Sequence, residues 1–171
     1  MAKTERYLRI AIFLLLAAFV FVVYDTLNEH VIVVGDKAPD FNITSDSGKQ
    51  ITRSNFGGRL LVLNFWATWC PPCIEELPSL DEFQRQLRSK GVVVVGVSVD
   101  KNEKQYKDFL RRARVSFETG RDPDAGISAE YGTFKYPETY VIDTSGKVIA
   151  KYIGPKDWMS PDVIADMKKI L

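Results

Sequence analysis

Two cysteines, Cys70 and Cys73, are the residues of this chain best suited to chemistry, and the sequence contains no others. They lie in the motif Trp-Cys-Pro-Pro-Cys, between an apolar stretch and a segment with helical periodicity. A disulfide with this spacing closes a very short loop and therefore stabilises a fold little. The pattern favours a redox-active dithiol over a structural cross-link.

The order of the two cysteines predicts their roles. We expect Cys70 to be exposed at the start of a helix, where partial positive charge and unpaired amides stabilise a thiolate. Cys73, one turn further along, would be the resolving thiol. Because Pro71 and Pro72 have no N–H, the amide of Cys73 is the first donor available to the Cys70 sulfur. We therefore expect only moderate acidity at Cys70, and a reduction potential near the reducing end of the range from about −270 to −120 mV.

The elements around this motif are predicted to form a parallel βαβ unit. Residues 60–65 are a short apolar run, as in a strand buried on both faces. Residues 71–89 have apolar side chains at helical spacing, and Gly91 ends this helix, while Pro78 is expected to kink it. Residues 92–99 are almost all β-branched, which favours a second parallel strand joined by a right-handed crossover.

The remaining elements complete one α/β domain with a sheet covered on both faces. From periodicity and turn signals we expect a hairpin in residues 36–56, helices at 103–114 and 127–131, strands at 139–143 and 148–153, and a last helix with Ser160 as N-cap and Pro161 first. Residues 119–125 and 134–137 are expected to be surface loops that determine partner specificity.

The N-terminal segment has the composition of a membrane anchor. Residues 10–24 are an unbroken apolar run, and apolar neighbours extend it towards the roughly 20 residues needed to cross a bilayer. Lys3, Arg6 and Arg9 precede the run, and acidic residues follow it, which predicts a cytoplasmic N-terminus and a folded domain on the other side. A cleaved signal peptide is the alternative, but the sequence Tyr-Asp-Thr-Leu after the run lacks a small-x-small cleavage site.

The chain is therefore expected to have four parts: a cytoplasmic N-terminus at 1–9, a transmembrane signal anchor at 10–27, a linker at 28–35 and a folded domain at 36–171. A length of 171 residues allows one domain with its own core and does not favour two. The 23 basic residues nearly balance the 22 acidic ones, so the composition does not indicate a nucleic-acid partner.

Two motifs resemble a known family. The segment FWATWCPPCIEELP, with Pro78 after the second cysteine, resembles thioredoxin and specifically its membrane-anchored TlpA/ResA/DsbE-like branch. The segment from Tyr136 to Thr139 lies where that family has its cis-proline loop, and its sequence is similar to that of the DsbE (CcmG) members. The resemblance covers residues 36–171 and implies a thioredoxin fold, with a mixed central sheet, helices on both faces and an N-terminal β-hairpin extension.

The same resemblance implies a substrate-binding loop. Pro137 would be cis and lie against the dithiol, where its backbone could pair with an extended substrate. Tyr136 precedes it, and Trp69 would flank the nucleophile at the surface. Trp66, on the preceding strand, is expected to pack in the core.

The resemblance also identifies a candidate for proton transfer. Thioredoxin has a buried aspartate where this chain has Asn64, which cannot titrate. Glu76 matches an acidic residue of ResA-like proteins, and three residues after Cys73 it shares that helical face. Glu75 is expected to be solvated, and both glutamates could instead simply complement the helix dipole.

The function implied is extracytoplasmic thiol-disulfide exchange that reduces the disulfides of specific protein partners, for example an apocytochrome c Cys-x-x-Cys-His site, as in cytochrome c maturation. It needs no metal and no cofactor other than the Cys70–Cys73 disulfide, but it does need a membrane thiol reductase as electron donor. The expected location is the bacterial inner (cell) membrane, as a single-pass protein with its domain in the periplasm.

Other functions fit the sequence less well. A peroxiredoxin-like peroxidase has its nucleophile in a Pro-x-x-x-Thr-x-x-Cys pattern, whereas Thr68 precedes Cys70 by only two residues. Zinc needs four ligands, and a copper metallochaperone needs a histidine late in the domain. The only histidine is His30.

Overall fold

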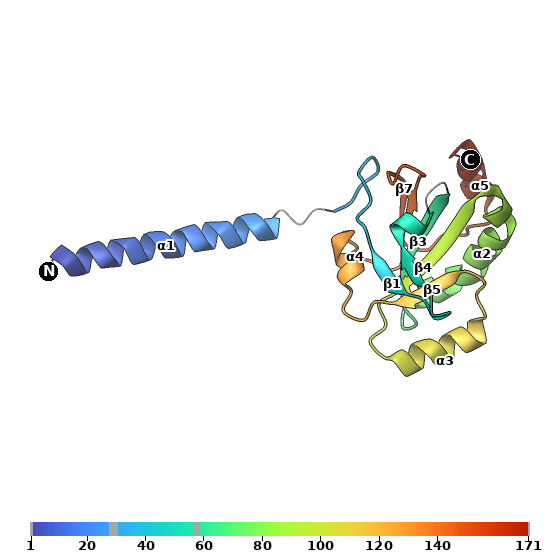
Figure 1. The fold of residues 1–171 in the computed structure, drawn as a ribbon, viewed down its shortest axis with the longest axis horizontal. Coiled ribbons are helices and arrows are strands. Elements are labelled where there is room, and N and C mark those ends of the chain that lie inside the picture. The colour runs from blue at the N-terminus through green and yellow to red at the C-terminus, as the bar shows by residue number, and fades with distance from the viewer. Residues whose placement is uncertain (1, 28–30, 57–58, 171) are drawn as a thin grey trace. The chain divides into compact units, whose positions relative to one another are not determined.

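The computed structural model describes residues 2–27, 31–56 and 59–170 of the chain (Figure 1). The chain separates into two compact units, the first ending at His30 and the second beginning at Val31. The first unit contains helix α1 (Ala2–Leu27). Within it, Thr4–Tyr24 is long and apolar enough to cross a membrane, in agreement with the apolar run found in the sequence.

The second unit is built on a five-stranded mixed sheet with the strand order β5-β4-β3-β6-β7. Strands β3, β4 and β5 are parallel, whereas β6 and β7 are antiparallel to their neighbours. Every residue of the central strand β3 is buried, which explains why all of its residues except Asn64 are apolar. The strand bounds are β3 (Leu60–Trp66), β4 (Val92–Ser98), β5 (Glu118–Arg121), β6 (Glu138–Ile142) and β7 (Val148–Ile153).

Both faces of this sheet are covered, as expected for a thioredoxin fold. On one face, helices α2, α3 and α5 pack around one apolar cluster. On the other face, the N-terminal hairpin and α4 pack around a second apolar cluster. Figure 1 shows α2 and α5 on the opposite side of the sheet from α4 and β1. The bounds are β1 (Asn42–Thr44), β2 (Gln50–Thr52), η1 (Arg53–Phe56), α2 (Pro71–Leu87), η2 (Arg88–Lys90), α3 (Glu103–Ala113), α4 (Gly126–Glu130) and α5 (Pro161–Ile170).

The predicted βαβ unit is confirmed in its main features. Strand β3 leads into α2, which continues through Pro78, and a short 3-10 turn then ends at Gly91 with φ of 87°. This left-handed conformation suits glycine and stops the helix. The first turn of α2 therefore follows the carboxyl end of a fully buried strand after a short connection, residues 67–70.

The sequence prediction of a surface loop at residues 119–125 is wrong in its first part. Residues Glu118–Arg121 form β5, and Thr119 and Gly120 are buried. The hairpin extension docks here, because the amide of Asp46 donates to the carbonyl of Thr119 at 2.9 Å. A Cβ at Gly120 would lie 2.8 Å from the carbonyl oxygen of Thr44, so this close approach requires glycine.

The folded unit also begins earlier than the residue 36 that the sequence suggested. Ile32, within the predicted linker, is buried. Its amide donates to the carbonyl of Tyr131 at 3.2 Å, and its carbonyl accepts from Lys151 Nζ at 3.0 Å. The chain is thus attached to the domain from Val31 onwards, while residues 28–30 lie outside the described residues.

Candidate active site

The two cysteines form a disulfide at the start of α2. Their Cα atoms are 5.3 Å apart, and Cys70 is the N-cap residue of the helix. The amide of Cys73 donates to the Cys70 sulfur at 3.3 Å, as predicted from the missing N–H groups of the two prolines. A thiolate at Cys70 would therefore lie at the positive end of the helix dipole with one amide donor.

Cys70 is more enclosed than the sequence suggested. Its exposed fraction is 5%, against 0% for Cys73, because Cys70 belongs to an apolar cluster of buried residues that also contains Trp66 and Ala67. The prediction of a freely exposed nucleophile is therefore corrected to a narrow opening. Cys70 is still the more exposed of the two cysteines, so a partner can reach only Cys70 directly.

The loop before β6 packs against the apolar cluster that contains both cysteines, through Tyr136. The Tyr136–Pro137 bond is cis, as the resemblance implied, and Pro137 is buried. The ring of Tyr136 packs edge-on against that of Trp69 with 6.1 Å between centroids. Since Trp69 adjoins Cys70 and is 57% exposed, the pair of rings forms a surface next to the opening.

Within this loop, the backbone amide and carbonyl of Tyr136 are available to a partner. The carbonyl of Pro137, which the sequence suggested for substrate pairing, already accepts from the amide of Gly154 at 2.8 Å. In the described part of the chain, no residue forms a hydrogen bond with the amide or carbonyl of Tyr136. An extended segment could therefore pair with Tyr136 rather than with Pro137.

Glu76 is a buried carboxyl one helical turn after Cys73. Its exposed fraction is 3%. Oε1 accepts from Asn64 Nδ2 at 2.8 Å, and Oε2 accepts from the amide of Lys156 at 3.0 Å. Burial raises the pKa of Glu76 to about 7, although both hydrogen bonds act to lower it. A carboxyl with a pKa near neutral pH can both take up and release a proton under ordinary conditions.

Solvent reaches the neighbourhood of Glu76 through a small cavity. Its volume is about 270 Å³, which is large enough for water. It is lined by Glu75, Glu76, Ser79, Pro155, Lys156 and Asp157. A proton held by Glu76 therefore has a route to bulk water, and Glu75 is exposed at its rim, as expected.

Asn64 connects this carboxyl to the cis-proline strand. Its Nδ2 donates to both Glu76 and the hydroxyl of Thr139, the latter at 2.9 Å. Thr139 lies two residues after Pro137, so one amide group links α2 with β6. The sequence showed only that Asn64 cannot titrate; the structure shows that it orients the residue that can.

Asp100 is a site residue that sequence reasoning missed. It is buried and accepts from the amide of Thr68 at 2.9 Å, from its hydroxyl at 2.6 Å and from the hydroxyl of Ser98 at 2.6 Å. These bonds fix the segment that leads into Trp69 and Cys70. Its position just after β4, next to the end of β3, is a signal that could have found it, because the carboxyl ends of parallel strands meet at one edge of a sheet.

Replacing Asp100 with alanine is expected to destabilise the fold and slow disulfide exchange. The change leaves the Thr68 amide and two hydroxyls without their acceptor, which should lower the free energy of unfolding by about 2 kcal/mol. Urea unfolding measures this, with the exposed Asp124→Ala as control. Equal stabilities of the two variants would show that Asp100 does not hold this segment.

Among residues 2–27, 31–56 and 59–170 there is no group of three or more metal-ligating side chains. His30, the only histidine of the chain, lies outside these ranges.

Comparisons with known proteins agree with this site. The AhpC/TSA family model matches residues 34–151. The thiol-disulfide oxidoreductase ResA of Bacillus cereus is 32% identical over 157 residues, which are 90% of this chain and 91% of ResA. The thioredoxin-like protein YneN of Bacillus subtilis is 36% identical over 122 residues, which are 70% of this chain and 71% of YneN.

Solved structures give the same assignment. A protein of Chlorobium tepidum, assigned as thiol:disulfide interchange protein DsbE, matches with a TM-score of 0.76 and 29% identity over 81% of this chain and 98% of its own. StoA of Bacillus subtilis matches with a TM-score of 0.63 and 27% identity over 70% and 90% of the two chains. Because such matches span most of both partners, the chain belongs to the AhpC/TSA family and is a thioredoxin-fold thiol-disulfide oxidoreductase of the ResA and DsbE type.

Proposed function

We propose that this oxidoreductase is a membrane-anchored reductant of partner disulfides outside the cytoplasm. The observation that carries the proposal is the Cys70–Cys73 pair at the start of α2, with only Cys70 open to a partner. The near-neutral carboxyl of Glu76 supports it, because each turnover must remove a proton from the buried thiol of Cys73.

The reaction proceeds in two exchange steps. In the first, the Cys70 thiolate attacks one sulfur of the partner disulfide; a mixed disulfide forms and the other partner sulfur leaves as a thiolate. In the second, Cys73 gives its proton to Glu76 and attacks the Cys70 sulfur, which releases the remaining partner sulfur. Two electrons pass to the partner, whose two thiolates take up protons from water to give a dithiol, and the Cys70–Cys73 disulfide is formed. Glu76 then loses its proton to water in the adjoining cavity.

The surface around Cys70 favours an extended protein segment as substrate. The free amide and carbonyl of Tyr136 can form strand-like hydrogen bonds, and the rings of Trp69 and Tyr136 offer an apolar contact beside them. In keeping with the likeness to DsbE, we propose that apocytochrome c, with its Cys-x-x-Cys-His site, is one such partner.

Repeated turnover requires an electron donor. A second dithiol protein must reduce the Cys70–Cys73 disulfide by the reverse exchange, and a membrane thiol reductase is the proposed donor. The proposed arrangement is a cytoplasmic segment at 1–9, a single membrane span and a domain on the periplasmic side of the inner membrane. The helix Thr4–Tyr24 supports the span, and the basic residues before it support the orientation.

Trapping tests the proposed partner. A Cys73→Ala variant cannot complete the second step, so it should accumulate a mixed disulfide through Cys70 with an oxidised Cys-x-x-Cys-His peptide. Failure to capture this peptide, while other disulfide peptides are captured, would exclude the apocytochrome role. Consumption of hydrogen peroxide by the reduced protein, with no reduction of disulfides, would favour a peroxidase instead.

A further inference from the structure

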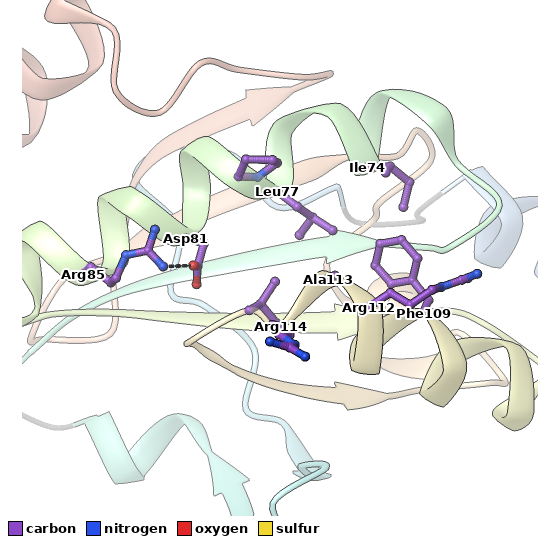
Figure 2. A pocket seen from close by; sticks show the side chains of 10 residues that line it. Ile74, Leu77, Asp81, Arg85, Phe109, Arg112, Ala113 and Arg114 are labelled. Atoms are coloured by element: carbon purple, nitrogen blue, oxygen red, sulfur yellow. Dashed lines mark hydrogen bonds and ion pairs between the residues drawn. The ribbon is translucent and has the colours of Figure 1, made fainter.

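A groove with an apolar floor lies between α2 and the end of α3, outside the exchange site described above. Its volume is about 550 Å³. Figure 2 shows Ile74 and Leu77 from α2 on one side and Phe109 and Ala113 from α3 on the other. Ile74 directly follows Cys73 in the sequence, so the groove begins beside the catalytic turn of α2.

The rim of this groove is positively charged. Arg85, Arg112 and Arg114 line it, together with a single acidic residue, Asp81. Asp81 is already neutralised, because it is paired with Arg85 and also accepts from the hydroxyl of Ser116 at 2.7 Å. The net charge that the rim offers an incoming molecule is therefore positive.

Arg112, near the end of α3, and Arg114, the C-cap residue that follows it, both line the groove. The other basic residues of the helix have acidic partners on the same helix: Lys104 and Arg111 pair with Asp108, and Lys107 pairs with Glu103. The guanidinium groups of Arg112 and Arg114 form no ion pair or hydrogen bond within the described ranges of the chain. Two exposed, neighbouring cations above an apolar floor are complementary to a molecule that carries both apolar and acidic groups.

We propose that this groove docks an apolar, acidic segment of the protein whose disulfide reacts at Cys70, and this inference rests on the proposed function. An apolar side chain of the partner fills the groove between Leu77 and Phe109, and neighbouring carboxylates contact Arg112 and Arg114. A protein segment is favoured because the groove begins at Ile74, one helical turn after Cys70, the N-cap of α2. A partner bound at one is thus held within reach of the other.

The test uses two disulfide peptides that differ only in charge. Both contain the same oxidised Cys-x-x-Cys core, extended by Glu-Leu-Glu-Phe-Glu in one and by Lys-Leu-Lys-Phe-Lys in the other. The reduced full-length protein, in phosphatidylcholine nanodiscs without net charge, should react with the acidic peptide at a KM about tenfold lower, as expected for two or more new ion pairs. High salt should reduce this preference.

Matched variants test whether the preference for the acidic peptide arises at the groove. Arg112→Gln with Arg114→Gln should remove the preference, whereas Lys107→Gln with Arg111→Gln removes the same charge from α3 outside the groove and should retain it. Ala113→Trp should fill the groove and raise the KM of the acidic peptide, whereas Ala165→Trp, on the exposed face of α5, should not. Reduction of glutathione disulfide, which is too small to use the groove, should be the same in all five proteins.

The outcomes separate docking from the exchange function. Equal reaction of the two peptides, or a preference that survives in both groove variants, would overturn the docking proposal while reduction of glutathione disulfide continued. Binding of octanoate without any preference between the peptides would assign the groove to a small amphipathic anion and would also overturn it. If neither glutathione disulfide nor the peptides were reduced, the proposed function itself would fail.

Discussion

Substitution of Cys70 by serine is expected to reduce disulfide exchange to the background rate. The hydroxyl of serine is not ionised near neutral pH, so it cannot replace the thiolate that attacks the partner disulfide. The remaining Cys73 is fully buried and cannot take over the first step. The rate of reduction of a disulfide peptide, followed by release of its thiols, measures this loss.

The matching variant Cys73→Ala should behave differently. It retains Cys70 and should therefore attack once, forming a stable mixed disulfide but completing no turnover. Full turnover by Cys70→Ser, or equal first-step rates in both variants, would contradict the assignment of Cys70 as nucleophile and Cys73 as resolving thiol.

Substitution of Glu76 by glutamine is expected to change both the kinetics and the pH dependence of stability. An amide cannot accept the proton of Cys73, so the second exchange step should slow by roughly a hundredfold or more, the usual contribution of a positioned acid or base. The inflection near pH 7 in the rate of that step, which follows the raised pKa of Glu76, should disappear. Stopped-flow measurement of mixed-disulfide decay tests this, with the exposed Glu75→Gln as control.

The stability effect of Glu76 has a definite sign. Below pH 4.5 its carboxyl is protonated in both folded and unfolded chains, since 4.5 is its ordinary pKa and burial raises it to about 7 in the fold. As the pH rises from 4.5 to 7, the unfolded chain loses this proton while the folded one keeps it. The fold should therefore lose up to about 3 kcal/mol of stability across this window, and remain at the lower value above pH 7.

The pH dependence, rather than the absolute stability, is the quantity to compare. Glu76 accepts hydrogen bonds at both carboxylate oxygens, from Asn64 and from the Lys156 amide, whereas glutamine has only one acceptor oxygen. The variant therefore loses one of these bonds at every pH, so its effect on stability at a single pH combines two causes. Urea unfolding of the full-length protein in detergent at several pH values should show the loss in the wild type and not in Glu76→Gln. Parallel pH profiles would mean that the carboxyl is not protonated in the fold at neutral pH.

The sequence predicted the elements that depend on local pattern. Strand β3, helix α2 and strand β4 were predicted because their apolar residues follow a clear pattern and because Gly91 ends the helical segment before β4. The short strand β5 was missed, since Glu118 to Arg121 is neither apolar nor β-branched throughout. Its conformation depends on pairing with β4 and on the hairpin that docks against Gly120.

The sequence predicted the two cysteines of the candidate site, but it did not predict the hydrogen bonds that support them. The spacing of Cys70 and Cys73 indicates the chemistry directly. The hydrogen bond between Asn64 and Glu76, and the bonds from Thr68 to Asp100, join residues that the fold brings together from different elements. Such contacts arise only when β3, β4 and α2 are packed, and the position of Asp100 just after β4 is the one sequence signal for them.

The most direct test of the proposed function is whether the reduced protein transfers its electrons to a protein disulfide. The full-length protein is reduced, freed of reductant and mixed with an excess of insulin, and the Cys70–Cys73 bond and the new insulin thiols are both quantified by mass spectrometry. We predict that one Cys70–Cys73 disulfide forms for each insulin disulfide lost. If the insulin disulfides stay intact while both cysteines remain reduced, the dithiol is not a reductant of protein disulfides.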